Sequence, residues 1–183
     1  MPRPALAPLL ALLLAGFTFG LAGARAADSA EYQIKAAFLY RFAQFTEWPA
    51  SALAGSDQLM LCVLGEDPFD GLLNGIAGNT VHQRKLAVQR LTDLQQLSQC
   101  HIAFVGAMRP DTLSQVIKRS RQLNVLTVAD QKGFAAGGGI IQFVIANDRV
   151  QFEINSAAAD KAGLKLSSHL LKLARTLYTT SPD

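Results

Sequence analysis

The sequence is poor in cysteine and in charged residues, and each shortage excludes a class of protein. Only 2 of its 183 residues are cysteines, too few for a disulfide-rich scaffold or a structural zinc module. Charged residues make up 17% of the chain and hydrophobic residues 50%, a balance that excludes an intrinsically disordered protein. A chain of this length and composition is expected to fold as one domain with a sizeable hydrophobic core.

The chain also lacks the motifs that mark common catalytic and cofactor sites. It has no G-x-S-x-G nucleophile turn, and no G-x-G-x-x-G follows its first predicted strand. Its three histidines, His82, His101 and His169, lack the spacing of known metal-binding motifs. The sequence therefore predicts no catalytic residue, no metal and no cofactor. An enzyme of an unfamiliar type remains a minor hypothesis.

Residues 1–26 show the three parts of a secretory signal peptide. Arg3 supplies the positive start, residues 6–22 are uncharged and largely apolar, and Ala24-Arg25-Ala26 is an A-x-A cleavage site. The alternative is a membrane-anchoring helix, but an apolar stretch of about 17 residues is at the low end for spanning a bilayer. We expect the segment to be cleaved. The mature protein, 27–183, is then a single periplasmic domain that does not span the membrane.

The charge of the mature chain gives little reason to expect a nucleic-acid partner. The precursor has a net charge of +3, and loss of Arg3 and Arg25 with the signal leaves 15 basic and 14 acidic residues. The densest remaining basic cluster, residues 118–121, lies at the end of a predicted helix, where cations complement the helix dipole. A nucleic-acid patch is the alternative interpretation of that cluster, but a near-neutral chain lacks the charge that phosphate backbones attract.

The spacing of apolar residues predicts alternating helices and strands. Short continuous apolar runs indicate buried strands at 58–65, 85–91, 101–106 and 125–128, and helices are expected at 29–45, 67–78 and 110–123. Residues 140–145 and 150–154 form an antiparallel hairpin, because the segment between them is too short for a crossover. A helical region interrupted at Gly163 is expected from Ser156 to Leu177.

These elements predict an α/β fold. Strands separated by helices form parallel pairs with helices on both faces of the sheet. We expect a three-layer sandwich with a mainly parallel six-stranded sheet, a closing antiparallel hairpin and flanking helices.

The two cysteines fall on two different strands of the predicted sheet. Cys62 lies within one buried strand and Cys100 at the start of another. In the oxidising periplasm an isolated pair usually forms a disulfide, so we expect a Cys62–Cys100 bond. Two free buried thiols are the alternative.

Several landmarks along the chain together resemble the YfiR family of periplasmic proteins. The first is K-A-A-F-L-Y-x-F-x-x-F-x-x-W-P, from Lys35 to Pro49. It is followed in order by C-V-L-G at 62–65, C-H-I-A-F at 100–104, and G-F-x-x-G-G-G-I-I-x-F at 133–143. The last is F-E-I-N at 152–155 followed by A-G-L-x-L-S-S from Ala162. The resemblance covers essentially all of residues 30–178.

The resemblance implies a regulatory protein and not an enzyme. YfiR-like proteins inhibit a membrane-bound diguanylate cyclase by binding its periplasmic sensor region, and an outer-membrane lipoprotein can sequester the inhibitor. Members can form homodimers. By resemblance, the partner-binding patch includes Glu153 and a bulky apolar residue at Ile141, and a ligand pocket includes a basic residue at Lys165.

The sequence departs from the family pattern at two places. Ser167 stands where the family pocket can carry a histidine, so the resemblance does not identify a ligand. The second disulfide of the best-known member would join the positions of Ala135 and Gln142, so it is absent here. An alternative function is a small-ligand-binding domain that senses an amino acid or a nucleotide at the carboxyl edge of the sheet, where such folds bind ligands.

The disulfide leads to a direct prediction. The intact mass of the oxidised protein should be two hydrogen atoms below that of the reduced protein, as measured by mass spectrometry. Alkylation of both cysteines without prior reduction would contradict the bond.

Overall fold

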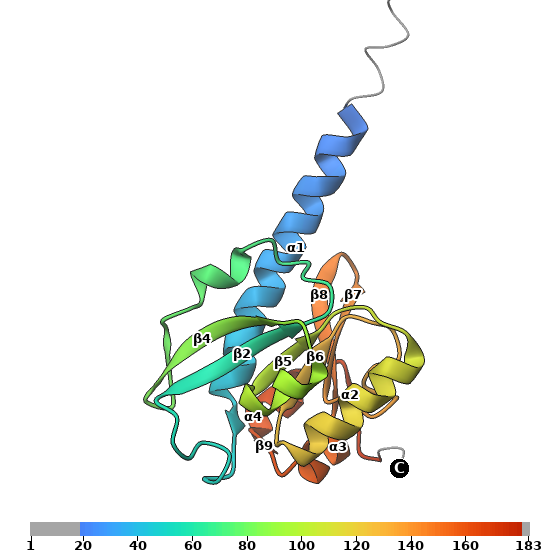
Figure 1. Cartoon of the computed structure of the whole chain (residues 1–183). Helices are drawn as coiled ribbons and strands as arrows, with labels where there is room; N and C mark the ends of the chain where they lie inside the picture. Colours follow the sequence, from blue (N-terminus) through green and yellow to red (C-terminus); the bar gives the residue numbers. More distant parts are fainter. Residues whose placement is uncertain (1–18, 181–183) are drawn as a thin grey trace, which may run out of the picture.

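The computed structural model describes residues 19–180 and shows a mixed α/β domain (Figure 1). Residues 1–18, most of the predicted signal peptide, lie outside the described residues. The helices are α1 (Phe19–Gln44), α2 (Pro110–Gln122), α3 (Ser156–Lys161) and α4 (Ser168–Leu173), with 3-10 helices η1 (Leu72–Gly75) and η2 (Leu94–Gln99). The strands are β1 (Thr46–Glu47), β2 (Gln58–Leu64), β3 (Thr80–Val81), β4 (Arg84–Leu91), β5 (Ile102–Val105), β6 (Leu126–Ala129), β7 (Ile141–Ala146), β8 (Arg149–Asn155), β9 (Lys165–Leu166) and β10 (Thr176–Tyr178).

The main sheet has eight strands rather than the six predicted, in the order β10-β8-β7-β6-β5-β2-β4-β3. The added strands, β3 and β10, are short and lie at its two edges. The β7–β8 hairpin is antiparallel as expected, but β3 and β4 form a second antiparallel pair. The remaining neighbours are parallel, and β1 and β9 form a separate two-stranded antiparallel sheet.

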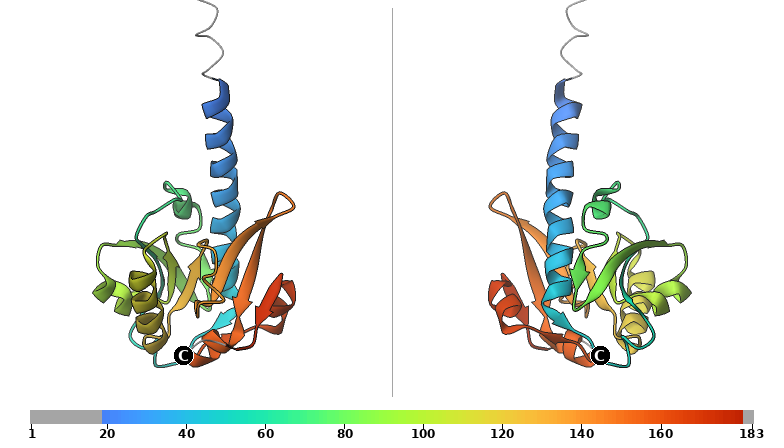
Figure 2. Two further views of the ribbon diagram at one scale, coloured as in Figure 1. Left: turned by 90° about the vertical axis from the view of Figure 1, so that its right-hand side faces the viewer. Right: turned by 90° about the vertical axis from the view of Figure 1, so that its left-hand side faces the viewer.

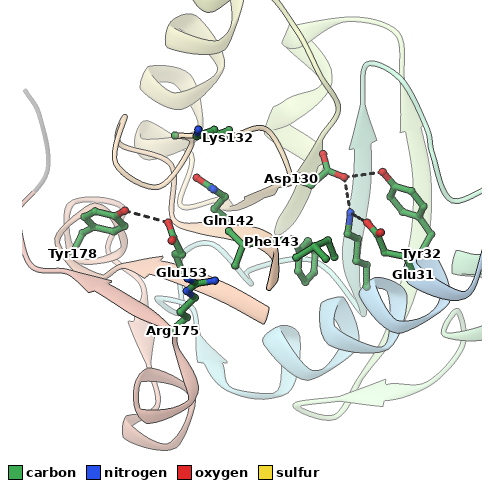
Figure 3. Close-up of a pocket in the computed structure, with 13 residues that line it drawn as sticks. Glu31, Tyr32, Asp130, Lys132, Gln142, Phe143, Glu153, Arg175 and Tyr178 are labelled. Atoms are coloured by element: carbon green, nitrogen blue, oxygen red, sulfur yellow. Dashed lines mark hydrogen bonds and ion pairs between the residues drawn. The ribbon is translucent and has the colours of Figure 1, made fainter. Parts of the chain in front are cut away.

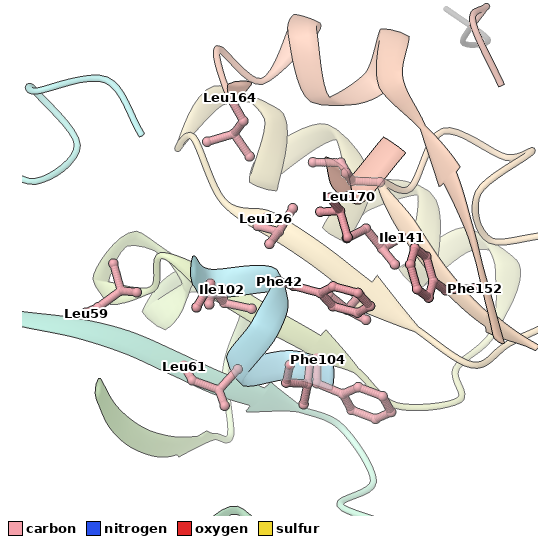
Figure 4. Packing of buried hydrophobic residues seen from close by; sticks show 14 of the residues in the cluster. Phe42, Leu59, Leu61, Ile102, Phe104, Leu126, Ile141, Phe152, Leu164 and Leu170 are labelled. Atoms are coloured by element: carbon pink, nitrogen blue, oxygen red, sulfur yellow. The ribbon is translucent and has the colours of Figure 1, made fainter. Parts of the chain in front are cut away.

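Helix α1 lies in the concave face of the sheet, which curls around it (Figure 2). Leu39 and Phe42 are fully buried there, and the Phe42 ring packs 5.1 Å from Phe152 and 5.6 Å from Phe143, measured between ring centroids. The cluster includes inward-facing residues of every long strand (Figure 4). The opposite face is covered by α2 and η2 over a smaller cluster.

Helix α1 begins earlier than the sequence predicted. The expected start was residue 29, but the helix already runs from Phe19 through the predicted cleavage site. This segment is rich in alanine and contains no proline, so nothing in it terminates a helix. No helix among residues 19–180 is both long and apolar enough to cross a membrane.

The predicted helix at 67–78 is wrong. Asp70 and Gly71 have positive φ values of 45° and 84°, which end any helix before it completes a turn. The Asp67 side chain accepts a hydrogen bond from the Phe69 N–H and so forms a turn instead of a helix cap. The apolar side chains that suggested a helical face are held by irregular turns and the single 3-10 turn of η1.

The predicted final helix is also wrong in part. Asn155, not Ser156, caps α3, through a hydrogen bond from the Ala158 N–H. Beyond Gly163, whose φ is +68°, the chain forms β9, α4 and β10 in place of a continued helix. Strand β9 pairs with β1, and β10 extends the main sheet alongside β8. The leucines after Gly163 have helical spacing, but they belong to three different elements, β9, α4 and β10.

The expected disulfide is present. Cys62 on β2 and Cys100 just before β5 are bonded, with their Cα atoms 5.9 Å apart and a sequence separation of 38. Because β2 and β5 are neighbouring parallel strands, the bond ties the segment before β5 to the middle of β2, within the smaller cluster beneath α2 and η2. Closing a loop of this length stabilises the folded state by about 4 kcal/mol in the chain-entropy treatment.

His101 is a buried polar link between the sheet and the loop after β1. Its Nδ1 accepts a hydrogen bond from the Met60 N–H (2.9 Å), and its Nε2 lies 3.2 Å from the Ala52 carbonyl oxygen. This network assigns the neutral tautomer with the proton on Nε2. Burial lowers the pKa of His101. The Ala52 hydrogen bond opposes that effect, and the positive charge of Arg84 adds to it.

This arrangement predicts a stability loss in mild acid. The folded state holds His101 at a pKa below its ordinary value of about 6.5, so the unfolded chain binds the proton more readily. The free energy of unfolding should therefore be fully maintained above pH 6.5 and fall as the pH drops through the folded pKa. Denaturant titrations at a series of pH values measure how steeply the free energy of unfolding falls with pH. His101→Asn should reduce this slope, whereas the same change at the exposed His169 should not. An unaltered slope in His101→Asn would contradict the assignment.

Candidate functional site

An open pocket of about 740 Å³ lies at the carboxyl end of β6 (Figure 3). The middle of α1 (Glu31, Tyr32 and Lys35) forms one wall, and β7 and β8 form another. The segment after β6 and residues around β10 complete it. Its walls carry charges of both signs: Glu31, Asp130 and Glu153 against Lys35, Lys132 and Arg175.

A buried lysine ties α1 to the end of β6 at this pocket. Lys35 is 3% exposed, and its Nζ lies 2.6 Å from Glu31 and 2.8 Å from Asp130. The Tyr32 hydroxyl donates to the same Asp130 oxygen at 2.8 Å. A buried ammonium without its carboxylates would carry a desolvation penalty of several kcal/mol, so the three side chains act as a unit. The cluster therefore ties α1 to the end of β6 along one wall of the pocket.

Glu153 connects the pocket to the edge of the sheet. Its carboxylate accepts hydrogen bonds from the Tyr178 hydroxyl (3.1 Å) and the Thr176 hydroxyl (3.4 Å), both on β10. As its position in the strand predicted, Glu153 lies on the face opposite Phe152 and Ile154. Desolvation raises the pKa of Tyr178, and the hydrogen bond and negative charge of Glu153 raise it further.

Ile141, expected by resemblance in a partner-binding patch, is 0% exposed. It lies in β7 between Val128 of β6 and Ile154 of β8, with its side chain in the core around α1. The Ile141 side chain therefore cannot contact a partner directly in this conformation. The exposed apolar residue of the same strand is Ile145, which is 51% exposed because it lies beyond the end of β6.

Lys165 and Ser167, the expected ligand-pocket residues, are not part of this pocket. Lys165 is an exposed residue of β9 opposite Glu47 of β1. The Ser167 hydroxyl accepts a hydrogen bond from the Leu170 N–H and caps α4. The structure therefore does not bring them together with Glu153, and a ligand at Ser167 would have to compete with the helix cap.

Hydrogen bonds connect the two positions of the missing second disulfide. The Ala135 N–H donates to the Gln142 side-chain oxygen at 3.2 Å, and the Ala135 carbonyl accepts from Asn155 at 2.8 Å. All three residues are buried. In residues 19–180 Cys62–Cys100 is the disulfide present, and no free cysteine occurs there.

Sequence reasoning missed most of the charged residues of the pocket. A lysine in the otherwise aromatic and apolar K-A-A-F-L-Y segment, four residues after Glu31, was the available signal. Asp130 immediately after a predicted strand was a second. Nothing in the sequence indicated that Lys132, Arg175 and Tyr178 would line the same pocket, because β10 was predicted as helix. Among the described residues no group of three or more His, Cys, Asp or Glu side chains is arranged to hold a metal ion.

The chain is similar to a protein family and, more weakly, to a solved structure. A protein-family model described as YfiR/HmsC-like matches residues 32–175. The fold is also similar to a crystal structure of a conserved domain protein from Vibrio cholerae O1 biovar El Tor strain N16961, with a TM-score of 0.48 and 11% sequence identity. That alignment covers 64% of this chain and 54% of the other, so the chain spans about half the length of that protein.

The Glu153–Tyr178 contact predicts a shift that can be measured. Glu153→Gln keeps the side-chain shape but removes the negative charge, so the pKa of Tyr178 should fall toward its ordinary value. Ultraviolet absorbance of the phenolate, recorded against pH, reports the shift. The chain has three tyrosines, so the transition that is lost in Tyr178→Phe is the one that belongs to Tyr178. Asp160→Asn, at an exposed site on α3, should leave it in place. An unmoved transition in Glu153→Gln would show that the carboxylate does not act on the phenol.

Proposed function

Because this chain belongs to the YfiR/HmsC-like family, we propose that it is a periplasmic inhibitor that binds the sensor region of an inner-membrane diguanylate cyclase. The family model covers most of the chain and supports a periplasmic regulator of diguanylate cyclase activity in general terms. Inhibition by direct binding is the specific step that we add. Sequestration of the inhibitor by an outer-membrane lipoprotein, and assembly into a homodimer, complete the proposal.

The observation that carries the proposal is the surface of the β7–β8 hairpin at the pocket, where Glu153 on one face and Ile145 on the opposite face both line the same hollow. It combines a half-buried carboxylate, a large exposed apolar side chain and an adjoining open pocket with charges of both signs. Protein interfaces typically pair an apolar centre with a polar rim of this kind. Ile141 supports this surface from inside the core, and Glu153 lies within it.

Two further features agree with a periplasmic location. The Cys62–Cys100 disulfide is of the kind that persists in oxidising compartments. The predicted signal peptide at 1–26 would direct the chain there. Both features suit a regulator that meets the external part of a membrane enzyme.

A second candidate function is the recognition of a small zwitterionic ligand such as an amino acid. The pocket volume of about 740 Å³ is within the usual range for ligand sites, and its opposed carboxylates and cations suit a molecule bearing both charges. Its position at the carboxyl end of a parallel strand is also where α/β folds bind ligands. Binding of free amino acids, measured by calorimetry without any cyclase, would favour this function.

The decisive experiment is genetic. Deleting the gene in its own bacterium should raise cellular cyclic di-GMP several-fold, as measured by mass spectrometry, because the cyclase is released from inhibition. Wild-type protein should restore the low level. Glu153→Lys should not, because it reverses a charge in the binding surface, whereas Asp160→Lys on the exposed surface of α3 should.

Two controls make the result specific. Immunoblots of periplasmic fractions verify that the variants accumulate equally, and Glu153→Gln separates loss of the charge from loss of the contact with β10. Unchanged or lower cyclic di-GMP after deletion would refute the inhibitor role. If Glu153→Lys fully restored the low cyclic di-GMP level, Glu153 would not be part of the binding surface.

A further inference from the structure

Strand β7 extends past the end of its neighbour β6. The pairing of the two strands stops at Ala129 and Gln142, but β7 continues to Ala146. On its other side β7 pairs with β8 along its whole length. Residues 143–146 therefore have a strand partner on one side only, and the hairpin projects from the sheet as Figure 2 shows.

The main-chain groups of Ile145 point toward this open side. Both residues of the turn between β7 and β8 have positive φ, 52° and 55°, as in a two-residue type I′ hairpin. In such a hairpin the pair flanking the turn, Ala146 and Arg149, exchanges both hydrogen bonds, and bonded and non-bonded pairs alternate from there. Ile145 and Val150 form the next, non-bonded pair. The N–H and C=O of Ile145 therefore point away from β8.

The open edge carries none of the usual protection against pairing with another chain. Exposed edges in soluble proteins are typically blocked by lysine, proline or a bulge, or kept very short. Residues 143–146 are Phe-Val-Ile-Ala, a regular apolar sequence, and Ile145 is 51% exposed. The outermost strands of the sheet, β3 and β10, have only two and three residues. The longer strands β4 and β8 are also unpaired on one side, at residues 87–91 and 149–152, but each of these stretches contains an arginine, whereas residues 143–146 contain no charged residue.

The space beside the edge is the pocket already described. Phe143, Val144 and Ile145 form one side of it, and Tyr32 and Lys35 on α1 form another. The pocket lies where a continuation of β6 would run, directly beyond Asp130. An extended segment of about four residues spans roughly 13 Å and matches the length of the open edge.

We infer that residues 143–146 accept an extended segment of the partner as an added β-strand. This inference rests on the proposed function and specifies how the cyclase sensor region would bind. Main-chain hydrogen bonds to Ile145 would supply affinity, and alternate side chains would supply specificity. Those facing α1 would be apolar, to meet Phe143 and Ile145. One facing the other side would be acidic, because Lys132 lines the pocket, is exposed, and forms no ion pair with the described residues.

Two proline variants test the inference within one hairpin. Ile145→Pro removes the outward N–H on the proposed edge, and Val150→Pro removes the equivalent N–H on the opposite edge of the same pair. Neither change breaks a β7–β8 hydrogen bond. Binding of the full chain to the purified periplasmic domain of the cyclase is measured by calorimetry. We expect Ile145→Pro to weaken it about tenfold or more, and Val150→Pro to change it less than about twofold.

Amide hydrogen exchange on the wild-type protein provides a test that needs no variant. The Ile145 amide should exchange quickly in the free protein and at least about tenfold more slowly in the complex, while that of Val150 should change little. This measurement decides the question if the Ile145→Pro variant fails to fold by circular dichroism.

The outcomes separate the two levels of the proposal. If the wild-type chain does not bind the sensor region, the proposed function fails, and strand addition fails with it. If it binds but Ile145→Pro binds equally well, or the Ile145 amide is not protected, only strand addition is overturned. If Ile145→Pro alters only the self-association of the chain, the edge serves a second copy of this protein, which also overturns the inference.

Discussion

The burial of α1 in the concave face of the sheet is the constraint on which the rest of the structure depends. Leu39 and Phe42 have no exposed surface, and their neighbours come from strands spread along the whole sheet. A flat sheet would contact only one narrow face of the helix, so the strands curl around it. Burying side chains of this size stabilises the fold by about 2–3 kcal/mol each. The same packing sets the positions of β7 and β8.

The pocket is a consequence of this arrangement. The sheet surrounds the C-terminal part of α1, but β6 ends early and the helix continues beyond it. Lys35 bridges the resulting gap by its ion pair with Asp130, and β7 and β8 extend past the same point. The polar cluster, the surface around Glu153 and the open strand edge therefore arise together at the place where helix and hairpin leave the body of the domain.

The sequence predicted the interior strands well and the peripheral elements poorly. Strands buried on both faces are continuous apolar runs, so β2, β5 and β6 could be located within about two residues. The disulfide was predicted because Cys62 and Cys100 are the only two cysteines of a chain expected in an oxidising compartment. At 67–78 and after Gly163 similar leucine spacing was mistaken for helix, because short apolar patterns do not distinguish a helix from a turn or an edge strand. Ile141 and Ile145 look equivalent in sequence, yet one is buried and the other exposed.

The sequence by itself determined the fold class, the central strands, the disulfide and, through its ordered motifs, the family. These depend on local apolar patterns and on residues close to one another along the chain or in neighbouring strands. Only the tertiary structure decided that Lys35 pairs with Asp130, that side chains of β10 bind Glu153, and that β7 extends past the end of β6. Each of these contacts depends on how elements distant in sequence are aligned with one another. Local sequence patterns carry no information about that alignment.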